Sequence, residues 1–314
     1  MAAAVAVLAL GACDPGRDAG RPPTPATSTT APAPEPDGSR IAFVTDRSGS
    51  GSLHIWVMGN DGGGARAVTA GADNDSAPVW SPDGRRIAFS RTVAAADPEI
   101  FVMNADGSGA RNVTDDPALD SNPSWSPDGA SLAFERRATG GGSAIMVAAA
   151  DGAGVRALTG SPGVTDTDPA WSPDGSRIVF ERRQGGGQAH LYLMGADGSD
   201  PRPLLAGAMA EAQTDPAWSP DGTAIAFSAV SGGGLAAIAV VAADGSGQRA
   251  LTDGTTVDGA PAWSPDGRRI AFYRAAVSAT GDIWSIGVDG SGLARLSDDD
   301  GIDTMPTWTG AAAP

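Results

Sequence analysis

The chain has 314 residues, a net charge of −16 and no lysine, so that all of its cationic side chains are arginines apart from two histidines. This acidity argues against a nucleic-acid partner, because phosphate binding needs clustered Lys and Arg, and it allows cations or basic proteins as partners. The single cysteine excludes an internal disulfide, and with only two histidines a transition-metal site with nitrogen and sulfur ligands is nearly excluded.

The N-terminus carries the sequence Leu10-Gly11-Ala12-Cys13 after the apolar stretch Ala2–Leu10. It resembles a bacterial lipobox, which implies a signal peptide over residues 1–12 and a lipid on Cys13. The apolar run is too short to cross a bilayer. No basic residue precedes it. The alternative is an ordinary alanine-rich terminus that contains an isolated cysteine.

Residues 13–36 have the composition of a tether. Pro, Thr, Ala and Ser dominate from Arg21 to Pro36, with almost no large apolar side chain. Such a segment buries too little surface to offset the entropy of ordering it. We therefore expect a disordered linker between a membrane anchor and a folded domain.

A repeat then fills residues 37–310 and leaves residues 311–314 as a tail. The sequence Trp-Ser-Pro-Asp-Gly occurs five times, followed each time by an apolar triplet such as Ile-Ala-Phe, and the tryptophans recur every 45 to 47 residues. Partial copies stand at both ends, Pro36-Asp37-Gly38 and Pro306-Thr307-Trp308. A period of this size with several short strands per copy is typical of a β-propeller.

Each copy predicts one four-stranded antiparallel blade. In the copy that starts at Trp125, Pro127-Asp128-Gly129 is a tight turn and Asp151-Gly152 a hairpin. Alternating apolar and polar residues mark the strands between them. The four strands predicted there are 124–126, 131–135, 144–149 and 155–159.

The two partial copies predict how the ring closes. The chain enters the repeat at a second strand, Arg40–Thr45, and leaves it after a first strand, Met305–Thr309. Pairing Trp308 beside Phe43 would join three N-terminal strands to one C-terminal strand. We therefore predict an all-β, six-bladed, monomeric propeller with this 3+1 closure, because a linear solenoid would need capping repeats at both ends.

The repeated motif, with its later Asp-Gly hairpin and Arg-x-Leu-Thr segment, closely resembles the WD40-like PD40 repeat of the TolB family propeller. This resemblance implies a propeller that binds proteins or peptides in the cell envelope. TolB carries an α/β domain before its propeller, and here only the tether of residues 13–36 occupies that place. The resemblance is therefore to a lipoprotein form of the fold without that domain.

Acidic residues just before the tryptophans are the candidate binding residues. We expect them in loops that enter the innermost strands and ring one mouth of the channel, where they could bind a cation, a basic peptide or a basic protein face. The alternative is that each aspartate only caps a loop by accepting backbone N–H groups. The candidates are Asp75, Asp120, Asp166, Asp258, Asp303 and Gln213 five residues before Trp, and Asp168 and Asp215 three residues before it.

Copies that deviate from the repeat are the better functional candidates, since a purely structural role recurs in every copy. Asp166 with Asp168, and Gln213 with Asp215, are the deviating pairs. Asp166, Asp168 and Asp215 are also the residues that we would assign to a Ca²⁺ site, and no other cofactor is expected. The repeated tryptophans are assigned to the core: Trp80, Trp125, Trp171, Trp218, Trp263 and Trp308.

Catalysis finds little support in this sequence, which lacks a Gly-x-Ser-x-Gly nucleophile motif. The leading hypothesis is a non-enzymatic, membrane-tethered, extracytoplasmic scaffold that binds a protein or peptide. Two alternatives remain, a sensor domain that binds Ca²⁺ or another ligand, and an accessory propeller of a carbohydrate-active or peptidase-related protein.

Overall fold

The computed structural model describes residues 38–309, apart from 50, 94–96, 138–140, 206–210 and 277–279. The predicted signal peptide, Cys13, the linker of residues 13–36 and the tail of residues 311–314 lie outside the described residues. Among the described residues, no helix has the length and apolar character that crossing a bilayer requires.

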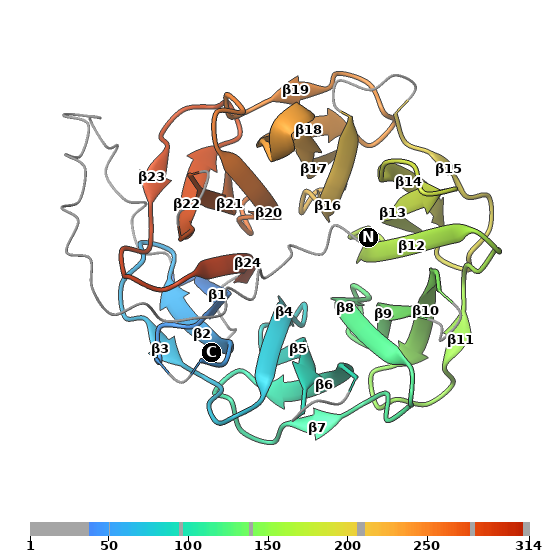
Figure 1. Ribbon diagram of the computed structural model, residues 1–314, viewed down its shortest axis with the longest axis horizontal. Coiled ribbons are helices and arrows are strands. Elements are labelled where there is room, and N and C mark those ends of the chain that lie inside the picture. Colours follow the sequence, from blue (N-terminus) through green and yellow to red (C-terminus); the bar gives the residue numbers. More distant parts are fainter. Residues whose placement is uncertain are drawn as a thin grey trace.

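The described strands surround a central axis and come in repeat units of four, as the propeller prediction requires (Figure 1). The innermost strand of each unit ends at or next to a repeated tryptophan. These strands are β24 (Asp303–Thr309), β4 (Asn74–Trp80), β8 (Leu119–Trp125), β12 (Val164–Trp171), β16 (Ala212–Trp218) and β20 (Val257–Trp263).

The second and third strands of each unit carry most of its buried apolar residues. The second strands are β1 (Arg40–Thr45), β5 (Arg86–Thr92), β9 (Ser131–Arg137), β13 (Arg177–Gln184), β17 (Ala224–Val230) and β21 (Arg269–Ala275). The third strands are β2 (His54–Gly59), β6 (Glu99–Asn104), β10 (Ser143–Ala149), β14 (His190–Gly195), β18 (Ala236–Ala242) and β22 (Asp282–Gly287).

The outermost strands are only two residues long, shorter than the sequence predicts, and each contains an arginine at the exposed edge. They are β3 (Arg66–Ala67), β7 (Arg111–Asn112), β11 (Arg156–Ala157), β15 (Arg202–Pro203), β19 (Arg249–Ala250) and β23 (Ala294–Arg295). We number the units in chain order from the first, β24 with β1–β3, to the sixth, β20–β23. A single 3₁₀ turn, η1 (Gly232–Gly234), precedes β18.

Four units form separate four-stranded sheets, which differs from the six separate blades that the repeat predicts. The fifth and sixth units share one eight-stranded sheet. Its two halves meet at one parallel pair, Ala236 of β18 opposite Val257 of β20. The repeat could not reveal this pairing, because it depends on how closely two neighbouring units approach at one edge.

The last described strand pairs with the first. β24 runs antiparallel to β1, with Trp308 opposite Ile41 and Thr304 opposite Val44, and a bulge separates the two parts of the ladder. Trp308 thus lies two residues out of register with the predicted neighbour, Phe43. The first unit therefore takes its innermost strand from the C-terminal end of the described chain.

The Ser-Pro-Asp-Gly segment forms the tight turn that the sequence predicts. In the second unit, Gly84 N–H donates to the Ser81 carbonyl over 2.8 Å, and Ser81 Oγ donates to Asp83 Oδ1 over 2.6 Å. Gly84 has a φ of 66°, which glycine adopts without steric cost. Serine and aspartate together therefore lock the turn between the innermost and second strands.

The apolar core lies between units rather than inside them. One buried cluster combines Ile55 and Val57 of the first unit with Trp80 and Phe89 of the second. A cluster of the same kind joins Phe43 of the first unit to the sixth. Each unit buries its apolar faces against two neighbours, as repeat architectures require.

The Asp-Gly hairpin of five units lies close to the residue that follows the outermost strand of the preceding unit. A Cβ on Gly107 would lie 2.0 Å from the Val68 carbonyl oxygen, and one on Gly62 would lie 2.2 Å from that of Leu296. Gly290 is less constrained, because its nearest neighbour, the Leu251 carbonyl oxygen, would lie 3.9 Å away. Backbone contact between units therefore requires glycine at most hairpins.

These distances predict different costs for the same substitution. Gly107→Ala should lower the free energy of unfolding by about 2–4 kcal/mol, since it adds both a clash and a side chain at positive φ. Gly290→Ala is the matched control, with a similar φ of 85° but room for the methyl group, and should cost about 1–2 kcal/mol. Urea unfolding measures both, and equal losses would refute the role of the close contact.

Candidate functional site

A cavity of about 480 Å³ opens at the axis of the propeller. Every unit contributes two equivalent residues to the lining of this cavity. They are the residue three positions before the repeated tryptophan and the proline two positions before that tryptophan. The lining residues three positions before tryptophan are Ala77, Asn122, Asp168, Asp215, Ala260 and Met305. We call this cavity the axial channel.

A bulge in each innermost strand turns these side chains toward the axial channel. The six residues have φ between 47° and 54°, in the left-handed region, and the ladder to the second strand shifts register beside them, as between Thr167 and Ala170. Asp and Asn tolerate this conformation better than other side chains. The bulge alone therefore explains part of the preference for Asp168, Asp215 and Asn122. These residues lie within strands, not in the predicted entry loops.

The acidic residues that line the axial channel, Asp168 and Asp215, come from two neighbouring units. Two glutamates of the second strands lie near them, outside the channel lining. Glu135 of β9 and Glu181 of β13 are buried. Glu181 Oε1 accepts the backbone N–H of Asp215 over 2.7 Å, and Asp168 and Glu181 share a side-chain hydrogen bond. Ser228 Oγ donates to Asp215 Oδ2 over 2.7 Å. Asp168, Asp215, Glu135 and Glu181 form what we call the acidic sector.

Burial and mutual repulsion favour protonation in the acidic sector. Burial, together with the charges of Glu135 and Asp215, raises the pKa of Asp168 to about 8. Burial, with the charges of Asp168 and Asp215 adding to it, raises the pKa of Glu181 well above its usual value. A hydrogen bond between two carboxyl groups also needs a proton on one of them. Asp168 therefore retains its proton at neutral pH.

The five aspartates located five positions before tryptophan are not exposed at the channel mouth, and this corrects the sequence-based expectation. Each is fully buried and faces an arginine. Four pairs are bidentate, with N–O distances of 2.6–2.9 Å, and in each the arginine follows the aspartate by 16 residues. These pairs are Asp75–Arg91, Asp120–Arg136, Asp166–Arg182 and Asp258–Arg274.

The guanidinium, rather than a backbone N–H group, is thus the main partner of these aspartates, so the capping alternative is also not realised. The same arginines stack on aromatic rings of their own unit. Arg182 lies 5.1 Å from the ring centre of Phe180 and 5.0 Å from that of Tyr192. A carboxylate, a guanidinium and aromatic rings therefore form one recurring structural element.

The fifth unit lacks this element completely. Gln213 replaces the aspartate, Ala229 stands opposite it in the arginine position, and Ala239 stands opposite Phe227 where other units have an aromatic residue or Met146. Gln213 is buried, and its Oε1 accepts the N–H of Leu191 over 3.3 Å. Its deviation from the repeat, which suggests a binding role, is accompanied by the loss of both the arginine and the third-strand aromatic residue, while Phe227 of the second strand is retained.

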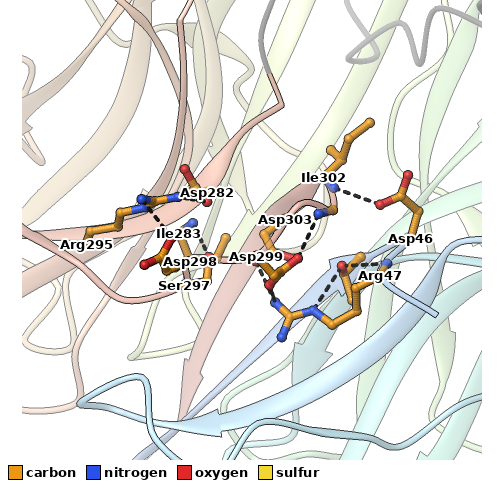
Figure 2. A network of polar contacts seen from close by, with 12 residues as sticks. Asp46, Arg47, Asp282, Ile283, Arg295, Ser297, Asp298, Asp299, Ile302 and Asp303 are labelled. Atoms are coloured by element: carbon orange, nitrogen blue, oxygen red, sulfur yellow. Dashed lines mark hydrogen bonds and ion pairs between the residues drawn. The ribbon is translucent and has the colours of Figure 1, made fainter. Parts of the chain in front are cut away.

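The pair between the first unit and the end of the chain is different again (Figure 2). Arg47 donates to Asp303 over 2.6 Å and lies 2.5 Å from Asp299, so it joins two acidic residues that precede or begin β24. Asp46 Oδ1 accepts the N–H of Ile302 over 2.7 Å. These contacts connect the loop after β1 to the segment that leads into β24.

The Ca²⁺ site expected at Asp166, Asp168 and Asp215 is not assembled. Asp166 is engaged by Arg182, whereas Asp168 and Asp215 belong to the acidic sector. In the described part of the chain, no group of three or more His, Cys, Asp or Glu side chains has an arrangement that could hold a metal ion.

Sequence reasoning missed Glu135 and Glu181, which complete the acidic sector. Both directly follow the phenylalanine of the second strand, where other units carry Val44, Ser90, Ser228 or Tyr273. This variation was visible in an alignment of the repeats. The sequence does not show that this position lies beside the residue of the next unit that has a left-handed backbone conformation, as Glu181 lies beside Asp215.

The repeated tryptophans pack at the junctions between units. Trp125 Nε1 donates to the Val79 carbonyl of the preceding unit over 3.2 Å, and Trp218 Nε1 donates to that of Ala170 over 3.1 Å. Trp80, Trp125 and Trp218 are buried, whereas Trp171, Trp263 and Trp308 remain partly exposed.

The four-stranded units around an axial channel define an all-β propeller. A profile of the PD40 family, described as the TolB beta propeller domain, matches residues 24–206, 75–252 and 117–312. The chain therefore belongs to this family.

Two solved structures have the same fold. TolB from Acinetobacter baumannii is 22% identical with a TM-score of 0.77, over 88% of this chain and 68% of that one. A putative TolB from Agrobacterium tumefaciens is 21% identical with a TM-score of 0.65, over 86% of this chain and 98% of that one. Identities this low establish the fold alone.

One curated relative shares a short segment. An uncharacterized peptidase of Bacillus subtilis is 41% identical over 59 residues, which are 19% of this chain. The match spans only 9% of the length of that peptidase.

The buried ion pairs predict a strong effect of removing one partner. Arg182→Met leaves Asp166 buried without its guanidinium, and we expect a loss of about 3–5 kcal/mol in the free energy of unfolding. The double variant Asp166→Gln/Arg182→Ala recreates the combination of the fifth unit and should recover part of this loss. Urea unfolding distinguishes the two, and a double variant less stable than Arg182→Met would contradict the assignment.

The acidic sector predicts stability that falls as pH rises. An aspartate in the unfolded chain loses its proton near pH 4, whereas folded Asp168 keeps its proton until about pH 8. The contribution of Asp168 to the free energy of unfolding is therefore fully present below pH 4. It is lost progressively as the pH rises to about 8. A difference of one in pKa corresponds to about 1.4 kcal/mol.

Unfolding in urea at pH 5.5 and at pH 8 tests this dependence. Asp168→Asn, which cannot ionise, should reduce the difference in unfolding free energy between the two pH values by at least about 1 kcal/mol. Asp197→Asn is a control at an exposed hairpin and should leave the difference unchanged. An equal pH dependence in wild type and Asp168→Asn would show that Asp168 is not protonated in the fold.

Proposed function

We propose that this protein is a non-enzymatic scaffold of the cell envelope that binds a protein or peptide at the axial channel. The observation that carries the proposal is the channel itself, about 480 Å³ and lined by prolines, tryptophans and one acidic sector. Apolar walls with a few convergent polar groups are typical of binding sites. Membership of the TolB propeller family supports a role in protein binding.

The acidic sector favours a partner with a basic group. Asp168 and Asp215 line the channel, and the chain carries a net charge of −16. A cation that approaches would favour ionisation of the Asp168 carboxyl group, which otherwise retains its proton. We propose that binding is therefore coupled to proton release from the sector.

The scaffold is proposed to work as a six-bladed ring in which the fifth and sixth units behave as two blades. A single parallel pair joins them, whereas each retains its own four-stranded hydrogen-bonded ladder. The pairing of β24 with β1 and the buried cluster around Phe43 support closure between the sixth and first units. A closed ring keeps the channel residues at constant spacing.

We further propose that the propeller is extracytoplasmic and is held at the membrane by a lipid on Cys13 through the linker of residues 13–36. The support is the lipobox-like sequence and the composition of the linker. Metabolic labelling with an alkyne fatty acid tests it, and Cys13→Ser should abolish labelling and release the protein into the soluble fraction. Label on Cys13→Ser would refute the anchor.

Site-specific photo-crosslinking in the native host tests the channel. A photoreactive residue at Ala260, which lines the channel, should give a discrete adduct with another protein, whereas one at the outer-edge Arg156 should not. Asp215→Arg should reduce the adduct at least about tenfold, because it places a like charge before a basic partner. Equal adducts from both positions would contradict channel binding.

The peptidase relative supplies a rival, an accessory propeller of an enzyme. Carboxyl groups with raised pKa values beside a channel are also candidates for acid–base chemistry. If purified residues 37–314 showed hydrolase or lyase activity that Asp168→Asn abolished, the scaffold proposal would fail.

A further inference from the structure

A second cavity, of about 600 Å³, lies at the junction between the fifth and sixth units. It is lined by Ala224 of β17, by Trp263 at the end of β20, and by the turn residues Asp221, Asp266 and Gly267, with Arg249 on its outer side. We call it the junction groove. Trp263 also borders the axial channel, but Ala224 and Arg249 belong to the groove alone.

Three other junctions show what normally occupies this place. There the first residue of the second strand is an arginine that reaches across and stacks on the tryptophan of the next unit. Arg40 lies 4.7 Å from the ring centre of Trp80, Arg86 lies 4.5 Å from Trp125, and Arg177 lies 5.1 Å from Trp218. In two of these junctions the guanidinium also donates to the glycine carbonyl of the next Pro-Asp-Gly turn, from Arg40 to Gly84 over 3.4 Å and from Arg86 to Gly129 over 3.2 Å.

At the junction groove this arginine is replaced by Ala224. The consequence appears in the exposure of the tryptophans. Those beneath an arginine, Trp80, Trp125 and Trp218, are only 5–8% exposed, whereas Trp263 is partly exposed. The junction groove therefore keeps three groups that lie beside an arginine at other junctions: the ring face of Trp263, the turn at Gly267 and the carboxylate of Asp221. The arginine itself is missing.

Asp221 corresponds to Asp83 and Asp174, two turn carboxylates that lie near the arginine of their own unit. The pKa of Asp83 in the second unit is lowered mainly by the hydrogen bond from Ser81, and the charge of Arg86 lowers it further. Asp221 has the same turn position and the same bond from a serine, Ser219 Oγ, over 2.6 Å. The groove thus offers a negative charge where a guanidinium would lie.

Arg249 does not block such a guanidinium. Its Nη2 donates to the Val288 carbonyl of the sixth unit. Arg111 donates in the same way to the Ala150 carbonyl over 2.7 Å, at the junction where Arg86 stacks on Trp125. One junction therefore accommodates both arginines.

We propose that the junction groove binds an arginine side chain of a partner protein or peptide. The guanidinium would stack on Trp263, donate to the Gly267 carbonyl and lie beside Asp221, which reproduces the arrangement of Arg86, Trp125, Gly129 and Asp83. The planar guanidinium suits stacking and carbonyl recognition together, whereas a lysine ammonium does not. The volume of about 600 Å³ exceeds one side chain and admits neighbouring residues of the partner.

The probes are the N-acetyl amides of arginine, lysine and citrulline, added to the full chain labelled with 5-fluorotryptophan. Trp263→Phe assigns the fluorine resonance of Trp263. We expect acetyl-arginine amide to shift this resonance saturably, and to bind at least about fivefold more tightly than the lysine and citrulline probes. Equal binding of all three, or no shift, would overturn the proposal.

Filling the groove provides the decisive variant. Ala224→Arg introduces the side chain that three other junctions carry, and it should abolish the shift while the remaining fluorine resonances report an intact fold. Ala224→Met fills the space without a charge and should also abolish it, which covers the case in which the first variant is unstable. Ser131→Arg, at the junction before Trp171, is the matched control and should bind the probe normally.

The inference is independent of the proposed channel function. Asp168→Asn/Asp215→Asn changes the axial channel and should leave arginine binding at Trp263 unaltered. Retained binding in Ala224→Arg would refute the groove, whereas loss of binding in the channel double variant would assign the probe to the channel instead.

Discussion

Packing between neighbouring units is the constraint on which the whole structure depends. Among the described residues, each buried cluster combines strands of two units, such as Phe43 with Ile283 across the junction of the first and sixth. Hydrophobic burial is the main favourable contribution to folding, and here it exists only where two units meet. The turns, the hairpin glycines and the buried ion pairs all hold units at the separation that this packing needs.

The repeat predicts the propeller, its turns and the pairing of its ends, because each of these depends on residues close together in the sequence or on simple periodicity. The identity of the buried pairs was less accessible. The position of Asp166, five residues before the repeated tryptophan, predicts a residue of the channel mouth, whereas the structure pairs it with Arg182 of the neighbouring strand. Two features of the sequence indicate these ion pairs. An aspartate is followed by an arginine 16 residues later in four units, and the fifth unit replaces both residues together, by Gln213 and Ala229.

The sequence predicts only two of the four residues of the acidic sector. Asp168 and Asp215 stand out because they deviate from the repeat, whereas Glu181 accepts the N–H of Asp215 in the next unit and the charge of Glu135 acts on Asp168 from the preceding unit. Contacts across a junction depend on the angle between units, and no sequence pattern within one unit contains that angle. The same limit applies to the parallel pair between Ala236 and Val257.

The pairing of β24 with β1 has a consequence for biosynthesis. The first unit begins with β1 near the N-terminus, yet its innermost strand, β24, leaves the ribosome after every other described strand. Until then, the edge of β1 that pairs with β24 has no partner strand, and the cluster that joins the first unit to the sixth lacks its contact with Trp308. The earliest unit to be translated is thus the last to be completed, and the chain has to keep this edge of β1 soluble throughout its synthesis.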